Sequence, residues 1–341
     1  MIDFDIKYIG NETIEGMRIM TDTKPRRELG KTGIEISPVG IGVMQFAGGK
    51  GFFRFMYADV PQADKDEIVK IALEGGVNWF DTAEIYGMGR SERTFQQALV
   101  NNGVNDEHVR IATKWWPAPR RAASIGRTIK NRVSNLEGYT IDLHQVHWPS
   151  SLSSIEAQMN AMADLVEAGK IRSVGISNFS GEQTRQAHAA LAKRKIPLAS
   201  NQVHFCLIDR SIETNGVLDA AKELGVTIIA YSPLASGLLS GKYHKDPDAL
   251  EKTPIARRGR VSRQLAETRP LIEALEGIAA KYNVTVSQVA LNWTVNFHGE
   301  TVVAIPGASK PYQARETAGV LDFSLTDAEM AQIDELTRRY K

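Results

Sequence analysis

From Lys24 to the C-terminus, the sequence alternates short β-branched runs with segments of helical spacing. Eight such runs occur, at 39–42, 78–81, 110–114, 143–148, 172–177, 198–202, 227–232 and 301–307. No linker rich in Pro, Gly or Ser interrupts the alternation. Strand–helix units of this number and spacing favour a parallel α/β fold closed into one (β/α)8 barrel, the TIM barrel, over two separate domains.

The barrel is expected to occupy residues 25–341, after an N-terminal extension of residues 1–24. Residues 26–37 are expected to form a short hairpin around Lys31-Thr32-Gly33. Helices are expected at 64–74, 91–100, 125–136, 155–168, 181–192 and 216–224, with a further helical stretch between Pro270 and Val295.

The balanced composition limits the partners of the chain. Hydrophobic residues make up 43% and charged residues 24% of it, which is ordinary globular usage and predicts a sizeable core. The 41 basic and 40 acidic residues leave a net charge of +1, so no strong field favours nucleic acid or an anionic membrane. We expect a small-molecule substrate and a monomer or small homo-oligomer.

Cysteine, histidine and N-terminal residues bear on compartment and metal binding. The single cysteine, Cys206, excludes an internal disulfide framework. Asp3 and Asp5 stand where a signal peptide carries basic residues, so a cytoplasmic location is expected. His144 and His147 form an H-x-x-H pattern, but an odd spacing on a strand sends them to opposite faces, so no metal site is expected.

Four polar residues lie near the C-terminal ends of the predicted strands, where barrels carry their chemistry: Asp81, Tyr86, Lys114 and His147. An unpaired buried charge is costly, so Asp81 and Lys114 are expected to pair, and such a pair alone would also fit a structural role. An ammonium beside Tyr86 stabilises its phenolate and makes it a usable proton donor and acceptor. His147 can donate a hydrogen bond to a substrate oxygen.

These residues lie in segments that resemble the aldo-keto reductases: D-T-A-E-I-Y-G at 81–87, A-T-K at 112–114 and V-H-W at 146–148. The similarity continues in V-G-I-S-N-F at 174–179, N-Q-V at 201–203, Y-S-P-L-A-S-G-L-L-S-G-K-Y at 231–243 and I-P-G-A-S-K-P at 305–311. The resemblance implies reduction of an aldehyde or ketone to the alcohol. It also implies that Tyr86 is the general acid, that Asp81 and Lys114 tune it, and that His147 orients the carbonyl.

The resemblance implies a nicotinamide cofactor, with NADPH favoured. No G-x-G-x-x-G motif opens a helix, so a Rossmann site is not expected, and the loops after the last two strands of the barrel are expected to hold the phosphates. By the resemblance, Ser177, Asn178 and Gln202 hold the nicotinamide carboxamide and Tyr231 stacks on the ring. Positions near the pyrophosphate are Ser232, Leu234, Ser236 and Lys242, and those at the adenosine end are Ser309, Lys310, Gln313 and Glu316. Ser309 and Lys310 suit a 2′-phosphate, which favours NADPH over NADH.

Two features of the cofactor region stay open. Thr317 departs from the asparagine usual in the family, which leaves the adenine contact undecided. Arg257 and Arg258 are expected in a long loop that either clamps the cofactor or is merely solvated.

Aromatic residues follow the strands that carry the polar residues. Trp115, Trp116 and Trp148 are expected to wall an apolar substrate pocket, although each alone also fits core or rim packing. Phe53, in an aromatic run after the first strand, is expected to contribute to a lid. Together they favour a bulky or aromatic carbonyl compound.

Two other functions remain open on the same scaffold. One is a cofactor-sensing binding module such as the potassium-channel beta subunits, which resemble this chain around Ser309 and Gln313 but carry asparagine at the position of His147. The other is an NAD-linked sugar or alcohol dehydrogenase. The histidine favours an enzyme over the binding module.

Overall fold

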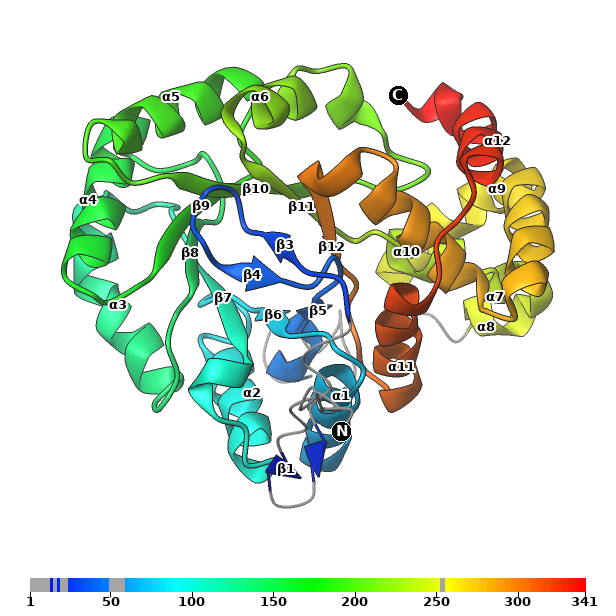
Figure 1. Ribbon diagram of the computed structural model, residues 1–341, viewed down its shortest axis with the longest axis horizontal. Helices are drawn as coiled ribbons and strands as arrows, with labels where there is room; N and C mark the ends of the chain where they lie inside the picture. The colour runs from blue at the N-terminus through cyan, green and yellow to red at the C-terminus, as the bar shows by residue number, and fades with distance from the viewer. Residues whose placement is uncertain (1–12, 15–16, 19–23, 49–58, 252–254) are drawn as a thin grey trace, which may run out of the picture.

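The computed structural model describes residues 13–14, 17–18, 24–48, 59–251 and 255–341. Eight parallel strands form one sheet in the order of the chain (Figure 1). They are β5 (Ile41–Gly42), β6 (Trp79–Asp81), β7 (Arg110–Trp115), β8 (Leu143–Val146), β9 (Ser173–Ser177), β10 (Leu198–His204), β11 (Thr227–Tyr231) and β12 (Val302–Ile305). Each strand coincides with one of the eight predicted runs.

The sheet closes on itself between its first and last strands. Val39 and Gly42 form parallel bridges with Ala304 and Gly307, and the Gly42 N–H donates to the Pro306 carbonyl at 3.0 Å. Closure pairs both edges of this sheet and turns it into a barrel. The predicted (β/α)8 barrel is therefore confirmed.

Helices surround the barrel on its outer side (Figure 1). They are α1 (Gln62–Glu74), α2 (Arg90–Asn101), α3 (Ala123–Asn135), α4 (Ile155–Glu167), α5 (Gly181–Ala192), α6 (Val217–Leu224), α7 (Lys242–Lys245), α8 (Pro247–Glu251), α9 (Ile255–Tyr282), α10 (Val286–Asn296), α11 (Pro311–Gly319) and α12 (Asp327–Thr337). Capping boxes begin several of them; at α5, the Ser180 hydroxyl accepts from the Gln183 N–H and the Gln183 side chain accepts from the Ser180 N–H.

Helix α9 corrects one expectation. Arg257 and Arg258 belong to this helix and not to a loop, and Pro270 lies inside α9 and does not mark its start. The prediction was wrong because residues 255–269 are rich in charged and polar residues, and a segment without a clear apolar stripe is poorly recognised as a helix from sequence.

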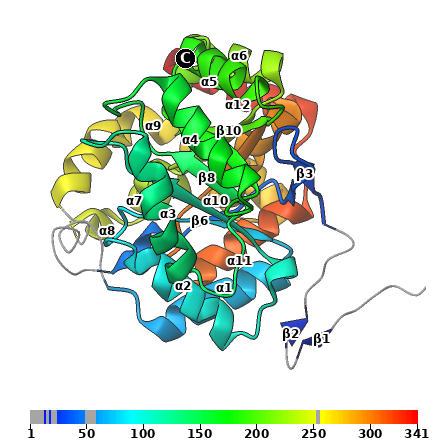
Figure 2. The same ribbon diagram turned by 90° about the vertical axis from the view of Figure 1, so that its left-hand side faces the viewer.

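A hairpin covers the end of the barrel at which the strands begin. Its strands β3 (Arg27–Glu28) and β4 (Glu35–Ile36) pair antiparallel, as predicted, and Figure 2 shows it at the end of the barrel opposite α7 and α8. Gly30 donates its N–H to Thr227 Oγ1 at 2.7 Å. Gly30 has φ +61°, and a Cβ there would come within 2.6 Å of the Ala199 carbonyl oxygen, so the hairpin needs glycine at this position.

The extension before the hairpin holds a second antiparallel pair, β1 (Thr13–Ile14) and β2 (Met17–Arg18), which the sequence did not predict. Inside the barrel, the hairpin residues Leu29, Ile34 and Ile36 join an apolar cluster with residues from six barrel strands: Trp79, Ala112, Leu143, Ala199, Ile229, Val303 and Ile305. Their burial seals this end of the barrel from water.

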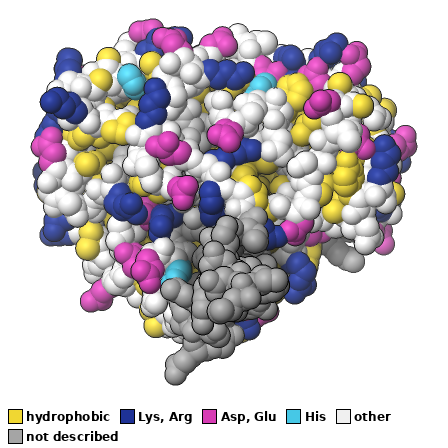
Figure 3. Space-filling view, in the orientation of Figure 1, with side chains coloured by type: hydrophobic (Ala, Val, Ile, Leu, Met, Phe, Trp, Pro, Cys, Tyr) yellow, Lys and Arg dark blue, Asp and Glu magenta, His cyan; other side chains and the backbone are white. Residues whose placement is uncertain are grey.

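The surface is mixed in charge. On the face seen in Figure 3, basic and acidic side chains are interspersed. Within the described residues, no helix combines the length and the apolar character that crossing a bilayer requires.

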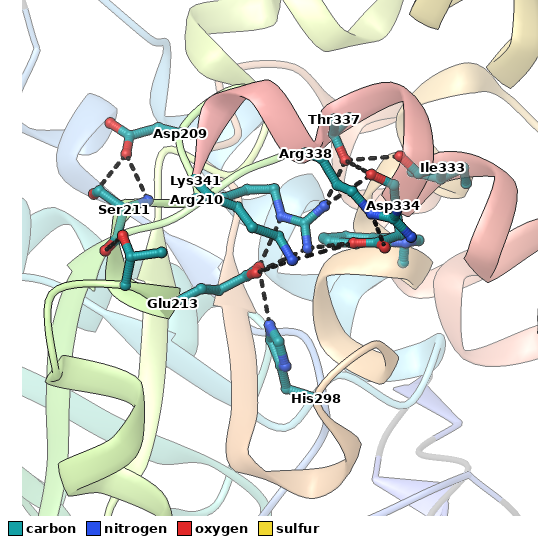
Figure 4. A network of polar contacts seen from close by, with 12 residues as sticks. Asp209, Arg210, Ser211, Glu213, His298, Ile333, Asp334, Thr337, Arg338 and Lys341 are labelled. Atoms are coloured by element: carbon teal, nitrogen blue, oxygen red, sulfur yellow. Dashed lines mark hydrogen bonds and ion pairs between the residues drawn. The ribbon is translucent and has the colours of Figure 1, made fainter.

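The C-terminal helix α12 is fastened to the loop after β10 by one buried arginine. The Arg210 guanidinium pairs with Glu213 and with Asp334 of α12, both at 2.7 Å (Figure 4). It also lies over the Trp293 ring, 4.7 Å from its centre. The Arg210 N–H donates to the Tyr340 carbonyl at 2.7 Å, so side chain and backbone both hold the C-terminus.

We predict that Arg210→Met lowers the free energy of unfolding by about 3–5 kcal/mol, because it removes the buried cation shared by Glu213 and Asp334 and leaves them only the more exposed Lys341 and Arg338. Burial opposes ionisation of Glu213, but hydrogen bonds from His298 and Arg210 outweigh it and lower the pKa of Glu213 to about 2. Urea unfolding of the variant and the wild type measures the difference.

The matched control is Arg185→Met, which removes an exposed arginine that pairs with Glu223 at the surface. Its effect is expected to be far smaller, because solvent screens such pairs. Equal losses in the two variants would contradict a structural role for the Arg210 network.

Candidate active site

An ion pair is buried at the end of the barrel where the strands terminate. Asp81 ends β6, Lys114 lies near the end of the adjacent β7, and the parallel pairing of these strands brings the two side chains together. The fully buried Lys114 ammonium pairs with the Asp81 carboxylate and donates to the Thr82 carbonyl at 2.9 Å. Each charge thus offsets the desolvation cost of the other.

Two strand glutamines complete the contacts of Asp81. Gln145 of β8 and Gln202 of β10 donate to Asp81 Oδ2 at 3.1 and 2.9 Å. Gln145 was not among the site residues predicted from the sequence. The available signal was its place two residues before His147 in a strand, because residues so spaced share a face.

The rings of Tyr86, His147 and Trp116 gather beside this ion pair. Lys114 Nζ lies 5.2 Å from the centre of the Tyr86 ring. The His147 ring meets those of Tyr86 and Trp116 nearly at right angles, with centres 5.7 and 5.3 Å apart. His147 Nδ1 is buried with no hydrogen-bond partner among the described residues, so it is a polar atom available to a ligand.

The local electrostatics keep His147 neutral. Burial lowers the pKa of Lys114, and the Asp81 carboxylate opposes this effect. Burial, and then the Lys114 charge, lower the pKa of His147 to about 2. At physiological pH the imidazole therefore carries a single N–H.

Asp81, Tyr86 and His147 line a cavity of about 510 Å³, and Lys114 lies buried directly behind Asp81. Its apolar walls are Met44, Ile85, Trp116, Trp148 and Ile305, and its other lining residues are Gly42, Gln45, Ser177, Asn178, Gln202, Tyr231, Ser232 and Gly307. An apolar cavity with a few convergent polar groups is typical of a site for a small molecule.

One wall of the cavity is a hydrogen-bonded group. The Tyr231 hydroxyl donates to Asn178 Oδ1 at 3.1 Å, and Asn178 Nδ2 donates to Ser177 Oγ at 3.0 Å and to the His147 carbonyl at 3.3 Å. Ser177 in turn donates to the Gln202 carbonyl at 2.8 Å. The structure thus brings together the four residues expected around a nicotinamide, on adjacent strands β9, β10 and β11.

A second cavity of about 520 Å³ meets the first at Gly307. Among the residues predicted to bind the cofactor, Leu234, Lys242, Gln313 and Glu316 line it, together with Thr317. Ser236 lines neither large cavity but a smaller one of about 90 Å³, which also contains Ser232. Burial raises the pKa of Glu316.

Ser309 and Lys310 lie at the start of α11. Their N–H groups both donate to Gln313 Oε1, at 2.8 and 3.1 Å, so they fix the side chain of a residue that lines the second cavity. The Lys310 ammonium pairs with Asp64 at 3.1 Å, with more than half of its side chain exposed.

The aromatic predictions have different outcomes. Trp116 and the partly exposed Trp148 line the cavity. The prediction for Trp115 was wrong: it is buried in the core, and its indole N–H donates to Ser124 Oγ at 3.1 Å. It follows Lys114 directly on the strand and therefore points to the opposite side, towards α3. Phe53 lies outside the described residues.

Comparison with known proteins decides the family. The profile of the Aldo/keto reductase family matches residues 38–338, which span all eight barrel strands. The chain belongs to the aldo-keto reductase family. It is an NAD(P)H-dependent oxidoreductase.

Several curated relatives are similar over most of their length. The chain is 35% identical to an uncharacterized oxidoreductase of Mycobacterium tuberculosis, over 90% of this chain and 91% of that one. It is 32% identical to the chloroplastic pyridoxal reductase of Arabidopsis thaliana, over 88% and 83% of the two chains. It is 30% identical to aldo-keto reductase YhdN of Bacillus subtilis, over 89% and 91%.

Solved structures agree with this family. A thermostable aldo-keto reductase, Tm1743, in complex with the inhibitor epalrestat superposes with a TM-score of 0.70 at 29% identity, covering 92% of this chain and 99% of that one. An aldo-keto reductase of Klebsiella pneumoniae in complex with NADPH has the same fold, with a TM-score of 0.70 at 22% identity and coverage of 92% and 95%.

The depressed pKa of His147 predicts a stability change with pH. Its folded pKa, about 2, lies below the ordinary 6.5, so the unfolded chain takes up this proton first as pH falls. The contribution of the neutral His147 to the free energy of unfolding is therefore complete above pH 6.5 and is lost progressively as the pH falls below that value. His144, with a pKa lowered to about 3 by burial and then by the charge of Arg132, acts in the same direction.

We predict that His147→Asn reduces the loss of unfolding free energy between pH 6.5 and about 5 by about 1 kcal/mol per pH unit. Urea unfolding at a series of pH values measures this slope, and the contribution of His144 should remain. A variant with the full wild-type slope would show that His147 is protonated in the folded protein.

Proposed function

We propose that the protein reduces an aldehyde or ketone to the alcohol, with NADPH as hydride donor and Tyr86 as proton donor. The observation that supports this most is the Lys114 ammonium, 5.2 Å from the centre of the Tyr86 ring, at a cavity that also contains His147. A cation at this distance favours the phenolate over the phenol. It therefore lowers the barrier to loss of the hydroxyl proton.

The neutral His147 imidazole would donate its N–H to the carbonyl oxygen and hold that oxygen near the Tyr86 hydroxyl. When bound, the reduced nicotinamide supplies the hydride that the carbonyl carbon accepts. Tyr86 gives its hydroxyl proton to the carbonyl oxygen, which completes the alcohol. Lys114 stabilises the phenolate that is left until a proton from water restores it.

The residues of the two cavities fit a dinucleotide. The first cavity provides the Asn178 amide and the Tyr231 ring for a nicotinamide, and the second provides the Lys242 ammonium for phosphate charge. At the junction, a Cβ on Gly307 would come within 2.3 Å of the Gln45 side chain, so glycine keeps the passage open. Gln45 Oε1 there is buried with no partner among the described residues and is available to a ligand.

Lys310 supports NADPH over NADH. Its ammonium is largely exposed, and its pair with Asp64 is a surface pair of the kind that contributes little. A phosphate could therefore replace the carboxylate as its partner.

We predict that Lys310→Met raises the KM for NADPH about 10-fold and leaves the KM for NADH nearly unchanged. The tenfold change corresponds to the loss of about one charge-assisted hydrogen bond to the 2′-phosphate, which NADH lacks. Steady-state kinetics with both cofactors measure it, and Lys222→Met, an exposed lysine on α6, serves as control. A wild-type enzyme that prefers NADH would instead favour an NAD-linked dehydrogenase.

The cavity walls favour an aromatic carbonyl substrate. Trp116 and Trp148 line the cavity beside the reacting groups, and an aromatic substrate gains from contact with aromatic rings. One relative is named pyridoxal reductase, and pyridoxal is an aromatic aldehyde. A panel of pyridoxal, benzaldehyde, propanal, a ketosugar, a ketosteroid and a quinone, scored by NADPH consumption, tests the proposal.

We predict that Tyr86→Phe lowers kcat for the best substrate by about 10²–10⁴-fold, the usual contribution of a general acid. NADPH binding, measured by fluorescence quenching, should change less than about twofold, because the substitution removes only the hydroxyl group.

The control is Tyr139→Phe, which removes a hydroxyl that donates to the Val104 carbonyl away from the cavity. It should retain wild-type turnover. Substantial turnover by Tyr86→Phe would overturn Tyr86 as the proton donor.

A further inference from the structure

The backbone of Trp116 is fastened on both sides by two side chains from outside the reacting group. Its N–H donates to Glu84 Oε1 at 2.6 Å, and its carbonyl accepts from Arg120 Nε at 2.7 Å. Glu84 and Arg120 also pair directly with each other. We call these two side chains the Glu84–Arg120 clip.

The clip is anchored in a buried network. The second oxygen of Glu84 accepts from Arg132 at 2.5 Å, and Arg132 donates to Glu92 at 2.7 Å. Glu92 in turn accepts from Thr113, the residue before Lys114 on β7, at 2.7 Å. The negative charges of the two carboxylates therefore offset the positive charges of the two guanidinium groups. A network with this many hydrogen bonds holds its side chains in one arrangement.

The two residues of the clip, through side chain and backbone, also join the three loops that carry Tyr86, Trp116 and Trp148. Glu84 lies in the loop that carries Tyr86, and Arg120 lies in the loop after β7. The Arg120 carbonyl accepts from the Leu152 N–H and the Ser151 hydroxyl, both at 3.0 Å, in the loop after β8 that also carries Trp148. A shift of the clip would thus move Trp116 relative to Tyr86.

We infer that Glu84 and Arg120 are positioning residues that hold Trp116 against the substrate and so set a preference for aromatic over small aliphatic carbonyl compounds. This inference rests on the proposed reductase function. The Trp116 ring lies edge-on to His147, 5.3 Å between centres, so a carbonyl held by His147 places an attached aromatic ring within reach of the indole. A small aliphatic aldehyde is too short to use this contact.

The first test compares benzaldehyde with propanal in Arg120→Met and Arg120→Lys, with NADPH as cofactor. In Arg120→Met we expect kcat/KM for benzaldehyde to fall about 10-fold, mainly through KM, because Trp116 loses its fixed position. For propanal the change should stay below about twofold, and NADPH binding should be unchanged. Arg120→Lys keeps the charge that pairs with Glu84 and should recover part of the loss.

Arg121→Met is the matched control, because Arg121 is the adjacent arginine and is exposed. It should leave both substrates unaffected. Glu84→Gln keeps an acceptor for the Trp116 N–H but loses the ion pair, and it should shift the substrate ratio in the same direction as Arg120→Met. Equal losses for both aldehydes, or no change in their ratio in any of these variants, would overturn the inference.

The second test does not depend on activity. Hydrogen exchange of the Trp116 amide in the protein without substrate should be slow in the wild type and in Arg121→Met, and at least about 10-fold faster in Glu84→Ala, which removes the acceptor of this N–H. An unchanged exchange rate of the Trp116 amide would show that the clip does not hold Trp116, even if the enzyme is active. If the wild type reduces none of the carbonyl compounds of the panel, the proposed function fails, whereas the exchange result still decides whether the clip holds Trp116.

Discussion

The structure of the candidate active site depends on one buried cation. Lys114 has no exposed surface, and a lysine in the interior of a barrel is tolerable only with a counter-charge in contact with it. Asp81 is that counter-charge, and it is itself held by Gln145 and Gln202, so strands β6, β7, β8 and β10 all contribute to one polar cluster. Because rigid strands fix this cluster, the position of the charge beside Tyr86 is fixed as well.

The two ends of the barrel have different roles: one end contributes to stability, and the other end contains the candidate active site. At the end where the strands begin, the β3–β4 hairpin seals an apolar cluster, and the cavity beside it, lined in part by Glu35 and Arg110, is only about 150 Å³. At the other end, loops surround two cavities that meet at Gly307. This division is general for the fold, and it lets the loops change substrate preference without weakening the core.

Arginine side chains hold the loops of this chain in place, and two of the three, Arg210 and Arg132, are buried. Arg210 ties the loop after β10 to the C-terminal helix, and Arg132 and Arg120 tie the loops after β6, β7 and β8 to one another. A guanidinium group suits this task because its planar donors reach several acceptors at once. The loops at the mouth of the barrel are therefore held from outside the cavity, which leaves the cavity free for cofactor and substrate.

The sequence by itself determined the eight strands and the positions of Asp81, Tyr86, Lys114 and His147, because apolar runs mark buried strands and polar residues at their ends mark the mouth of a barrel. Alternation along the strand carried the signal for Trp115 and Gln145, but only the closed barrel shows that the face of Lys114 and Gln145 points to its centre and that Trp115 packs against α3. Only the tertiary structure brought Glu84 to Trp116, because their contact spans two loops whose approach is set by barrel closure and not by any local pattern.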